Sequence, residues 1–456
     1  MGEEGKTLTG KAIFRFWAPL ALTWLMMAVE GPYLAALMAR LPNPKANLAA
    51  YGVAFVLAML FESPIIMMLS AATALATGGE STRRLFNFNV LLAGGSTLLM
   101  ALLALPWVFP AFAVRVLGLP GDVASLAHRS LLVLLPWPMA IGLRRFYNGV
   151  VIRRGLTRLV TAGTVVRLTV MGAAMVFFGR IAGVDGAVAG AAALSSGVVA
   201  EAAASRLMAA RTLRALRAAP GGEGVLTYGQ MARFYFPLAL TAVLFLAVNP
   251  LVTLFLGRSR MALESLAVLP VVNALGFLFG SAGIAYQEVT IALVGRRKEH
   301  YGELLRFARR LGAVLVFLFA VLVFTPLSRF WFLGVSGLRE DLAALAVPAA
   351  RILLFQPALT LALGFLRAVL VVEGDTRPAT WATLWEVGGI VGVLFVGVVL
   401  LDGVGALVAS SAYVLGRAAG VLRMVPPVRR SLAAAGLRLG GGPLPGGNGQ
   451  FPSSHT

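Results

Sequence analysis

The sequence predicts an all-α polytopic membrane protein, with twelve transmembrane helices in two six-helix lobes related by a parallel internal repeat. Composition, the spacing of apolar runs and the repeat itself support this fold class. Apolar residues make up 59% of the 456 residues and charged residues 13%. Soluble domains hold about 45–50% and about 25%, so an ordinary water-soluble enzyme is excluded. The chain has no cysteine, which excludes disulfides, thiolate catalysis and cysteine metal sites.

Each helix is expected from an apolar run long enough to cross a bilayer, which takes about 20 residues. The first run is interrupted by Glu30 and Pro32 and is too long for a cleaved signal peptide, so we expect a retained helix. The runs cover residues 12–38, 48–77, 86–111, 124–152, 159–180, 185–208, 231–256, 262–294, 304–327, 342–371, 378–400 and 403–424.

An internal repeat relates the two halves of these runs. Residues 15–23 match residues 233–241 at seven of nine positions without a gap. Six helices in each half return the chain to the same side, which makes the repeat parallel. The expected domains are an N-terminal lobe (1–211), a linker (212–229), a C-terminal lobe (230–430) and a disordered tail (431–456) rich in Gly, Pro and Ser.

The net charge is +20. With the N-terminus inside, the predicted inner loops and termini hold about three times as many basic residues as the outer loops. Both termini are therefore expected in the cytoplasm of a cell with a plasma membrane, most simply a bacterial one. This asymmetry explains the charge without a nucleic-acid partner.

Charged side chains inside the spans need partners or a wet cavity, because each costs about 2.5–3.5 kcal/mol at the bilayer centre. The repeat aligns Arg167 with Glu386 and, approximately, Glu201 with Arg417. Each lobe then carries one acid and one base on its last two helices. We expect structural ion pairs, Arg167 with Glu201 and Glu386 with Arg417.

Glu30 and Glu62 are candidates for ion coupling, since each precedes a proline that frees backbone carbonyls nearby. A buried acid at such a place can exchange a proton or hold a cation. The alternative is an exposed outer residue, or a pair with Arg144 or Arg145. Weaker coupling candidates are Glu288, which can equally face the cytoplasm, and Asn249 beside Pro250.

The apolar parts of the fourth and tenth predicted spans contain arginines but no acidic residue. Arg144, Arg145 and Asn148 lie in the fourth, and Arg367 of the tenth aligns with Asn148. Because arginine binds carboxylate and phosphate in a bidentate way, these residues are candidate anion ligands. The alternative is snorkelling to the interface. No nucleotide-binding or metal motif is present, so no cofactor is expected. Movement of the substrate would then be coupled to a gradient of H+ or Na+, or it would be facilitated without coupling.

The two halves of six helices, the parallel repeat and the proline-bent first helix resemble the multidrug/oligosaccharidyl-lipid/polysaccharide (MOP) exporter superfamily, which includes the MATE transporters. Within it, several stretches look most similar to the progressive ankylosis (ANK) family: Pro19-Leu20 with Glu30-Gly31, residues 50–55, Phe61-Glu62-Ser63-Pro64, residues 136–139 and 149–152, and residues 234–240. The resemblance implies two lobes that alternate between inward and outward openings. MATE members commonly exchange H+ or Na+ for organic cations, and Glu30 matches the acidic first-helix residue of one MATE branch. ANK members are linked to export of anions such as citrate or pyrophosphate.

Together these patterns predict a secondary transporter in the lipid bilayer that exports a small anion and works as a monomer. One alternative is a MATE-type cation or drug antiporter in which the arginines are structural. Another is a flippase for a lipid-linked polar head group. A membrane enzyme or receptor is disfavoured by the full-length duplication and by the lack of a catalytic constellation.

Overall fold

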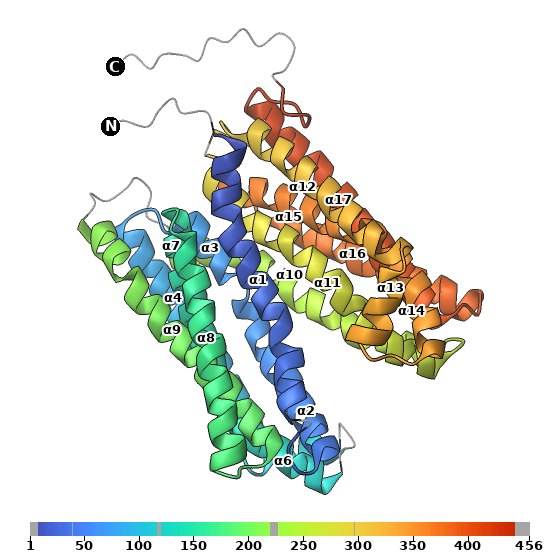
Figure 1. Cartoon of the computed structure of the whole chain (residues 1–456). Helices are drawn as coiled ribbons and strands as arrows, with labels where there is room; N and C mark the ends of the chain where they lie inside the picture. The colour runs from blue at the N-terminus through green and yellow to red at the C-terminus, as the bar shows by residue number, and fades with distance from the viewer. Residues whose placement is uncertain (1–7, 39, 116–119, 219–226, 296, 443–456) are drawn as a thin grey trace, which may run out of the picture. The chain divides into compact units, whose positions relative to one another are not determined.

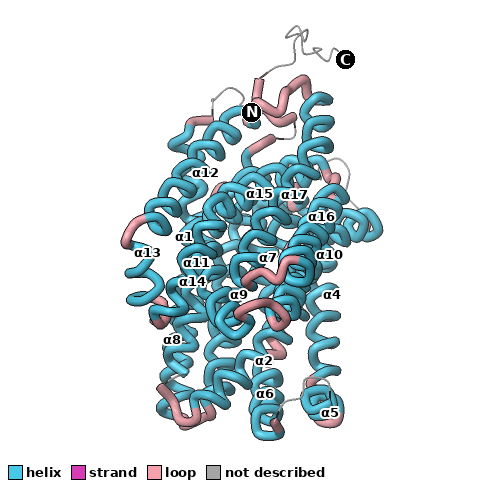
Figure 2. Tube along the Cα trace, turned by 90° about the vertical axis from the view of Figure 1, so that its right-hand side faces the viewer, coloured by secondary structure: helices cyan, strands magenta, loops and turns pink. Residues whose placement is uncertain are grey.

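The computed structural model describes residues 8–38, 40–115, 120–218, 227–295 and 297–442. In this part of the chain the regular structure is helical, apart from one isolated bridge between Arg260 and Val404 (Figure 2). The predicted all-α fold class is confirmed.

Contacts within the chain divide it into two units. Unit 1 comprises Met1–Ala21 and Ala247–Thr456, and unit 2 comprises Leu22–Leu246. Two long helices, α1 (Gly10–Met38) and α10 (Tyr228–Leu256), therefore contribute to both units. The lobes predicted from the repeat, 1–211 and 230–430, differ from these units in their boundaries and stay a prediction.

Unit 2 is built from the second part of α1, the first part of α10 and the helices between them (Figure 1). These are α2 (Pro44–Glu62), η1 (Ser63–Ile65), α3 (Met68–Leu75), α4 (Gly79–Leu103), α5 (Val108–Arg115), α6 (Gly121–Val133), α7 (Trp137–Arg153), α8 (Thr157–Val176), η2 (Phe177–Ile181) and α9 (Gly186–Ala218).

Unit 1 holds the first part of α1, the second part of α10 and the remaining helices. These are α11 (Ala262–Leu293), α12 (Tyr301–Phe324), α13 (Leu327–Arg329), η3 (Phe330–Val335), α14 (Glu340–Ile352), η4 (Leu353–Phe355), α15 (Gln356–Glu373), α16 (Arg377–Leu394), η5 (Phe395–Leu400) and α17 (Gly405–Ala434).

Prolines account for the breaks inside several spans. Pro64 lies in the 3-10 turn between α2 and α3, and Pro136 precedes α7. Pro357 begins α15 after the turn η4. A proline lacks the N–H that the helix needs and crowds the preceding turn, so the helix restarts there. The first helix differs, because α1 continues past residue 32 to Met38.

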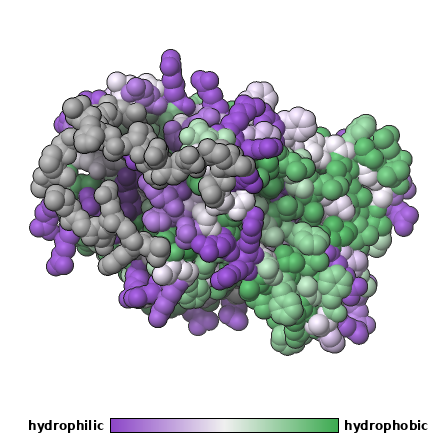
Figure 3. Space-filling model, turned by 90° about the horizontal axis from the view of Figure 1, so that it is seen from above, coloured by the Kyte–Doolittle hydropathy of each residue, from purple (hydrophilic) through white to green (hydrophobic). Residues whose placement is uncertain are grey.

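Eleven stretches of the described residues are long and apolar enough to cross a membrane. The 29-residue helix α10 occupies the place of the predicted seventh span. Large apolar side chains are exposed on these helices, among them Phe317, Trp381, Trp385 and Leu422. Hydrophobic side chains cover a broad area of the end-on face in Figure 3, and hydrophilic ones gather in another part. Such surfaces are expected against lipid.

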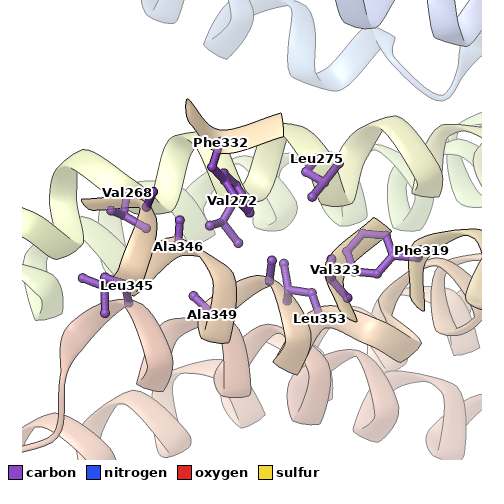
Figure 4. Packing of buried hydrophobic residues seen from close by; sticks show 13 residues of the cluster. Val268, Val272, Leu275, Phe319, Val323, Phe332, Leu345, Ala346, Ala349 and Leu353 are labelled. Atoms are coloured by element: carbon purple, nitrogen blue, oxygen red, sulfur yellow. The ribbon is translucent and has the colours of Figure 1, made fainter. Parts of the chain in front are cut away.

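The core of unit 1 lies where α11, α12, α14 and η3 meet (Figure 4). Phe319 packs edge-to-face on Phe279 with ring centroids 5.0 Å apart. Ala346 and Ala349 of α14 are fully buried against this cluster. Small residues at such contacts let membrane helices approach closely.

The chain ends differ from the prediction of a disordered tail from residue 431. Helix α17 continues to Ala434, and the Tyr301 hydroxyl donates to the Leu439 carbonyl at 3.0 Å. Residues 431–442 are thus held by the helix and by this contact, while residues 443–456 lie outside the described residues. In the predicted linker, α9 extends to Ala218, and residues 219–226 also lie outside the described residues.

Candidate functional site

A chain of buried charges runs through the helices of unit 2. Arg167 of α8 donates from Nε to Glu30 of α1 at 2.9 Å, and its Nη2 lies 2.6 Å from the same carboxylate oxygen. Arg167 Nη1 also lies 3.5 Å from an oxygen of Glu201 on α9. Arg167 therefore bridges two carboxylates from two different helices.

Glu201 connects this chain to the fourth span. The Glu201 carboxylate accepts hydrogen bonds from Arg144 Nη1 on α7, at 3.1 and 3.2 Å, and from the Thr164 hydroxyl at 3.3 Å. The order of charges is thus Glu30, Arg167, Glu201, Arg144. The expected pair of Arg167 with Glu201 is present, but the shorter contact of Arg167 is with Glu30.

A second pair stands beside this chain. Glu62, at the end of α2, accepts from Arg145 Nη2 at 3.3 Å and from the Trp137 indole N–H at 2.7 Å. The Arg167 guanidinium lies over the same indole, 5.7 Å from its ring centroid. Trp137 therefore contacts both charged groups. The alternative in which Glu62 pairs with Arg145 is the arrangement that the structure shows.

All six charged side chains of this network are buried, with at most 7% of any residue exposed. Three are acids and three are bases, so within the described residues the network is balanced. Ionised groups in such surroundings are stable only while paired, and removal of one partner typically costs about 3–5 kcal/mol. The six are Glu30, Glu62, Glu201, Arg144, Arg145 and Arg167.

Asn148 lies one turn after Arg144 on α7 and is held apart from this network. Its side-chain oxygen accepts from the Ser205 hydroxyl of α9 at 3.1 Å. Asn148 and Ser205 are both buried. This contact fixes α7 against α9 at the level of the charges.

Unit 1 holds a smaller cluster. Glu386 of α16 pairs with Arg417 of α17 at 2.9 Å, as the repeat predicts. Arg367 of α15 reaches the Thr383 hydroxyl at 3.5 Å, and its buried Nε has no hydrogen-bond partner. Among the residues that the structure describes, Arg367 forms no ion pair. Glu386 and Arg417 are the charges that act on it.

Helix packing corrects one alignment of the repeat. Gly197 of α9 approaches the carbonyl of Arg167, and Gly416 of α17 approaches the carbonyl of Glu386 in the same way. This register places Glu201 opposite Gly420, rather than opposite Arg417 as the sequence approximately indicated. Close helix approach at a glycine fixes register more tightly than apolar similarity does.

The remaining coupling candidates lie elsewhere. Glu288 is buried on α11, and Asn249 is exposed on α10; both belong to unit 1. Glu30 and Glu62 belong to unit 2. The structure thus brings Glu30 and Glu62 into one network and leaves the other two outside it.

Sequence reasoning missed two polar contributors to the network, Trp137 and Thr164, and the Ser205 hydroxyl that donates to Asn148. The Pro136-Trp137-Pro138 motif was a usable signal, because the indole N–H of a buried tryptophan needs an acceptor. The described residues contain no group of three His, Asp or Glu side chains that could hold a metal ion.

No protein-family model and no curated protein matches this sequence. Solved structures do match. A multidrug resistance MATE family transporter of the MOP superfamily in an outward-facing conformation superposes with a TM-score of 0.73 at 18% identity, over 93% of this chain and 96% of that one. The chain has the MATE fold.

Two more structures with the MATE fold are similar. A MOP superfamily transporter from Pyrococcus furiosus, described as having a binding pocket of reverse polarity, gives a TM-score of 0.72 at 17% identity, over 93% of this chain and 96% of that one. A mutant of the Vibrio cholerae MATE transporter VcmN gives 0.72 at 15% identity, over 93% and 97%. The predicted MATE/MOP-like fold is confirmed, and the ANK-like branch stays a prediction.

Proposed function

We propose that this protein is a secondary active transporter that moves a small carboxylate or phosphate by alternating access, driven by H+ or Na+. The observation that carries the proposal is the buried charge chain Glu30–Arg167–Glu201–Arg144 inside membrane helices of a MATE fold. Ionisable groups at membrane depth are costly, and they typically line ion or substrate pathways.

The chain offers a direct route to ion coupling. Glu30 and Glu201 share one arginine, so protonation of Glu30 would break its ion pair and leave Arg167 to Glu201. A Na+ ion at Glu30 would compete with the guanidinium in the same way. Either event removes the ion pair that joins α1 to α8. Glu62, which shares Trp137 with Arg167, is the second coupling candidate.

The anion is best accommodated at Arg367. Arg144 and Arg145 are neutralised by Glu201 and Glu62, so an anion there must displace a protein carboxylate. Arg367 has no such competitor among the described residues and lies beside the Thr383 hydroxyl. A guanidinium with free N–H groups and a neighbouring hydroxyl suits a carboxylate or phosphate oxygen. Arg144, Arg145 and Asn148 then hold a second position on the path.

A MATE-type cation antiporter is the second candidate, because one specific observation favours it. The three buried arginines of the unit 2 network are paired with acids, so this network does not present an uncompensated positive charge. One similar structure is described as a multidrug resistance transporter, and another as having a pocket of reverse polarity.

Measurements of efflux from proteoliposomes distinguish the anion transporter from the cation antiporter. Vesicles are loaded with labelled citrate or pyrophosphate, and a parallel set with ethidium, each with and without an imposed pH gradient. We expect gradient-dependent anion efflux that Arg367→Ala abolishes. The matched control is Arg351→Ala, because Arg351 is an exposed arginine that donates to the Val323 carbonyl. Ethidium movement alone, unchanged in Arg367→Ala, would establish the cation antiporter instead.

A further inference from the structure

Two hydrogen bonds on the first helix of each half are related by the internal repeat. The Trp17 indole N–H donates to the Ala282 carbonyl at 3.0 Å, and the Tyr235 hydroxyl donates to the Pro64 carbonyl at 2.6 Å. Donors 17 and 235 are 218 positions apart, and so are acceptors 64 and 282. Both donors lie in the segments that match at seven of nine positions. The duplication has therefore kept the contact although the donor differs, Trp17 in one half and Tyr235 in the other.

The surroundings of the two acceptors repeat as well. Ser63 donates to the Leu60 carbonyl at 2.7 Å, and Ser281, again 218 positions later, donates to the Leu278 carbonyl at 2.7 Å. One difference remains. Pro64 lies in the 3-10 turn η1, whereas Ala282 lies inside the unbroken helix α11.

Each donor segment packs with residues from the other half of the sequence. Trp17 contacts Phe307 of α12 edge-to-face, with ring centroids 6.2 Å apart. Tyr235 contacts Phe88 of α4 in the same way at 5.4 Å. These contacts explain why residues up to Ala21 belong to unit 1 although the rest of α1 belongs to unit 2. They also explain why α10 up to Leu246 belongs to unit 2 although the rest of α10 belongs to unit 1.

Helix α1 is consequently fixed at two points. Trp17 holds its beginning in unit 1, and the ion pair of Glu30 with Arg167 holds its middle in unit 2. Positions 17 and 30 are thirteen residues apart, which corresponds to about 20 Å of helix. A change at Glu30 thus acts on a helix whose other end is anchored. Without the anchor, α1 would shift without moving anything in unit 1.

We propose that Trp17 and Tyr235 are a matched pair of positioning residues that anchor the first turns of α1 and α10 to the opposite halves of the sequence. Each of the two helices then connects the two halves of the sequence and transmits movement during transport. The consequence for transport rests on the proposed function, whereas the anchoring itself rests on the two hydrogen bonds and the ring contacts.

Substitutions of a single polar group test the pair. Tyr235→Phe removes one oxygen, and Trp17→Phe keeps a ring but removes the N–H donor. Each is expected to lower gradient-driven anion efflux by about three- to twentyfold, the change that one hydrogen bond between membrane helices gives. The double variant should combine both losses. The matched control is Trp385→Phe, since Trp385 is largely exposed.

Distances between spin labels test the anchoring of the two helices independently of any transport activity. Because the chain has no cysteine, spin labels can be attached to introduced cysteines alone. One pair at Ala12 and Arg309 reports on the α1 segment in unit 1, and another at Leu91 and Ala232 reports on the α10 segment in unit 2; all four residues are exposed. Trp17→Phe should broaden only the first distance distribution, and Tyr235→Phe only the second.

Unchanged distance distributions in both variants would overturn the anchoring role. Unchanged efflux in the double variant would overturn the role in transport. If the unmodified protein moves neither anion nor ethidium, the proposed function fails, while the distance distributions still decide whether Trp17 and Tyr235 anchor the two helices.

Discussion

Units 1 and 2 share one helical plan but use charge differently. Thr164 and Thr383 occupy equivalent places, and each donates to the backbone carbonyl four residues before it. Near Thr164, unit 2 has a network of three acids and three bases, whereas the charged cluster near Thr383 in unit 1 consists of Glu386, Arg417 and Arg367. Duplication thus preserved the packing and let the two sites diverge, one toward balance and one toward net positive charge.

The exchange of residues explains this divergence. The place of Glu201 is taken by Gly420, and that of Asn148 by Arg367. One unit lost a carboxylate where the other kept it, and it gained a guanidinium. A balanced network suits the exchange of a small cation such as a proton, and a net positive cluster suits an anion. The comparison therefore assigns coupling to unit 2 and anion binding to unit 1, as a hypothesis that the following variants test.

The largest effect is expected from loss of the central arginine of unit 2. Arg167→Ala leaves Glu30 and Glu201 buried with one fewer cation, which should cost about 3–5 kcal/mol of folding free energy. Arg417→Ala should cost less, because the Arg417 side chain that pairs with Glu386 is 15% exposed, whereas that of Arg167 is 4% exposed. Thermal unfolding in detergent, with the loss of the monodisperse protein peak as the readout, measures the stability of both variants. Equal losses would mean that the two units depend on charge pairing to the same degree.

A residue exchange between the units sharpens the assignment of the anion. Arg367→Asn installs the residue that unit 2 has at position 148. It breaks no ion pair among the described residues, so the melting temperature should stay close to that of the unmodified protein. Anion efflux should fall by at least about tenfold, the loss expected for one charge-assisted hydrogen bond. Anion efflux that survives Arg367→Asn but disappears in Arg144→Ala would move the anion site to unit 2.

Packing at the two equivalent glycines gives a smaller effect with a defined order. A methyl group on Gly416 would lie 2.5 Å from a side-chain carbon of Ile390 and 2.7 Å from the Glu386 carbonyl. On Gly197 it would lie 2.9 Å from the Arg167 carbonyl and 3.1 Å from Met171. Gly416→Ala should therefore destabilise more than Gly197→Ala, within about 1–3 kcal/mol. Unfolding of the two variants is measured side by side, and a larger loss of stability in Gly197→Ala than in Gly416→Ala would contradict the prediction.

The sequence was sufficient for the fold because the relevant signals are linear. Apolar runs must reach a fixed length to cross a bilayer, and a duplication appears as one constant shift. The partners within a lobe were partly accessible for the same reason, since the repeat indicated Arg417 for Glu386. The contact of Arg167 with Glu30 was not, because it joins residues 137 positions apart whose helices have no fixed register in sequence. Trp17 likewise lay in a repeated segment, aligned with Tyr235, but nothing in the sequence indicated its acceptor.

The smallest effect distinguishes the two equivalent threonines. Thr164 donates to the Glu201 carboxylate as well as to its own helix, whereas Thr383 has its own helix and the 3.5 Å contact with Arg367. Thr164→Val keeps the shape and removes one donor to a buried charge, which should cost about 1 kcal/mol. Thr383→Val should change stability less, yet it should weaken anion efflux, because it removes the hydroxyl beside Arg367. A stability loss in Thr383→Val as large as in Thr164→Val, with anion efflux intact, would show that the Thr383 hydroxyl serves packing. That result would contradict the assignment of anion binding to unit 1 and ion coupling to unit 2.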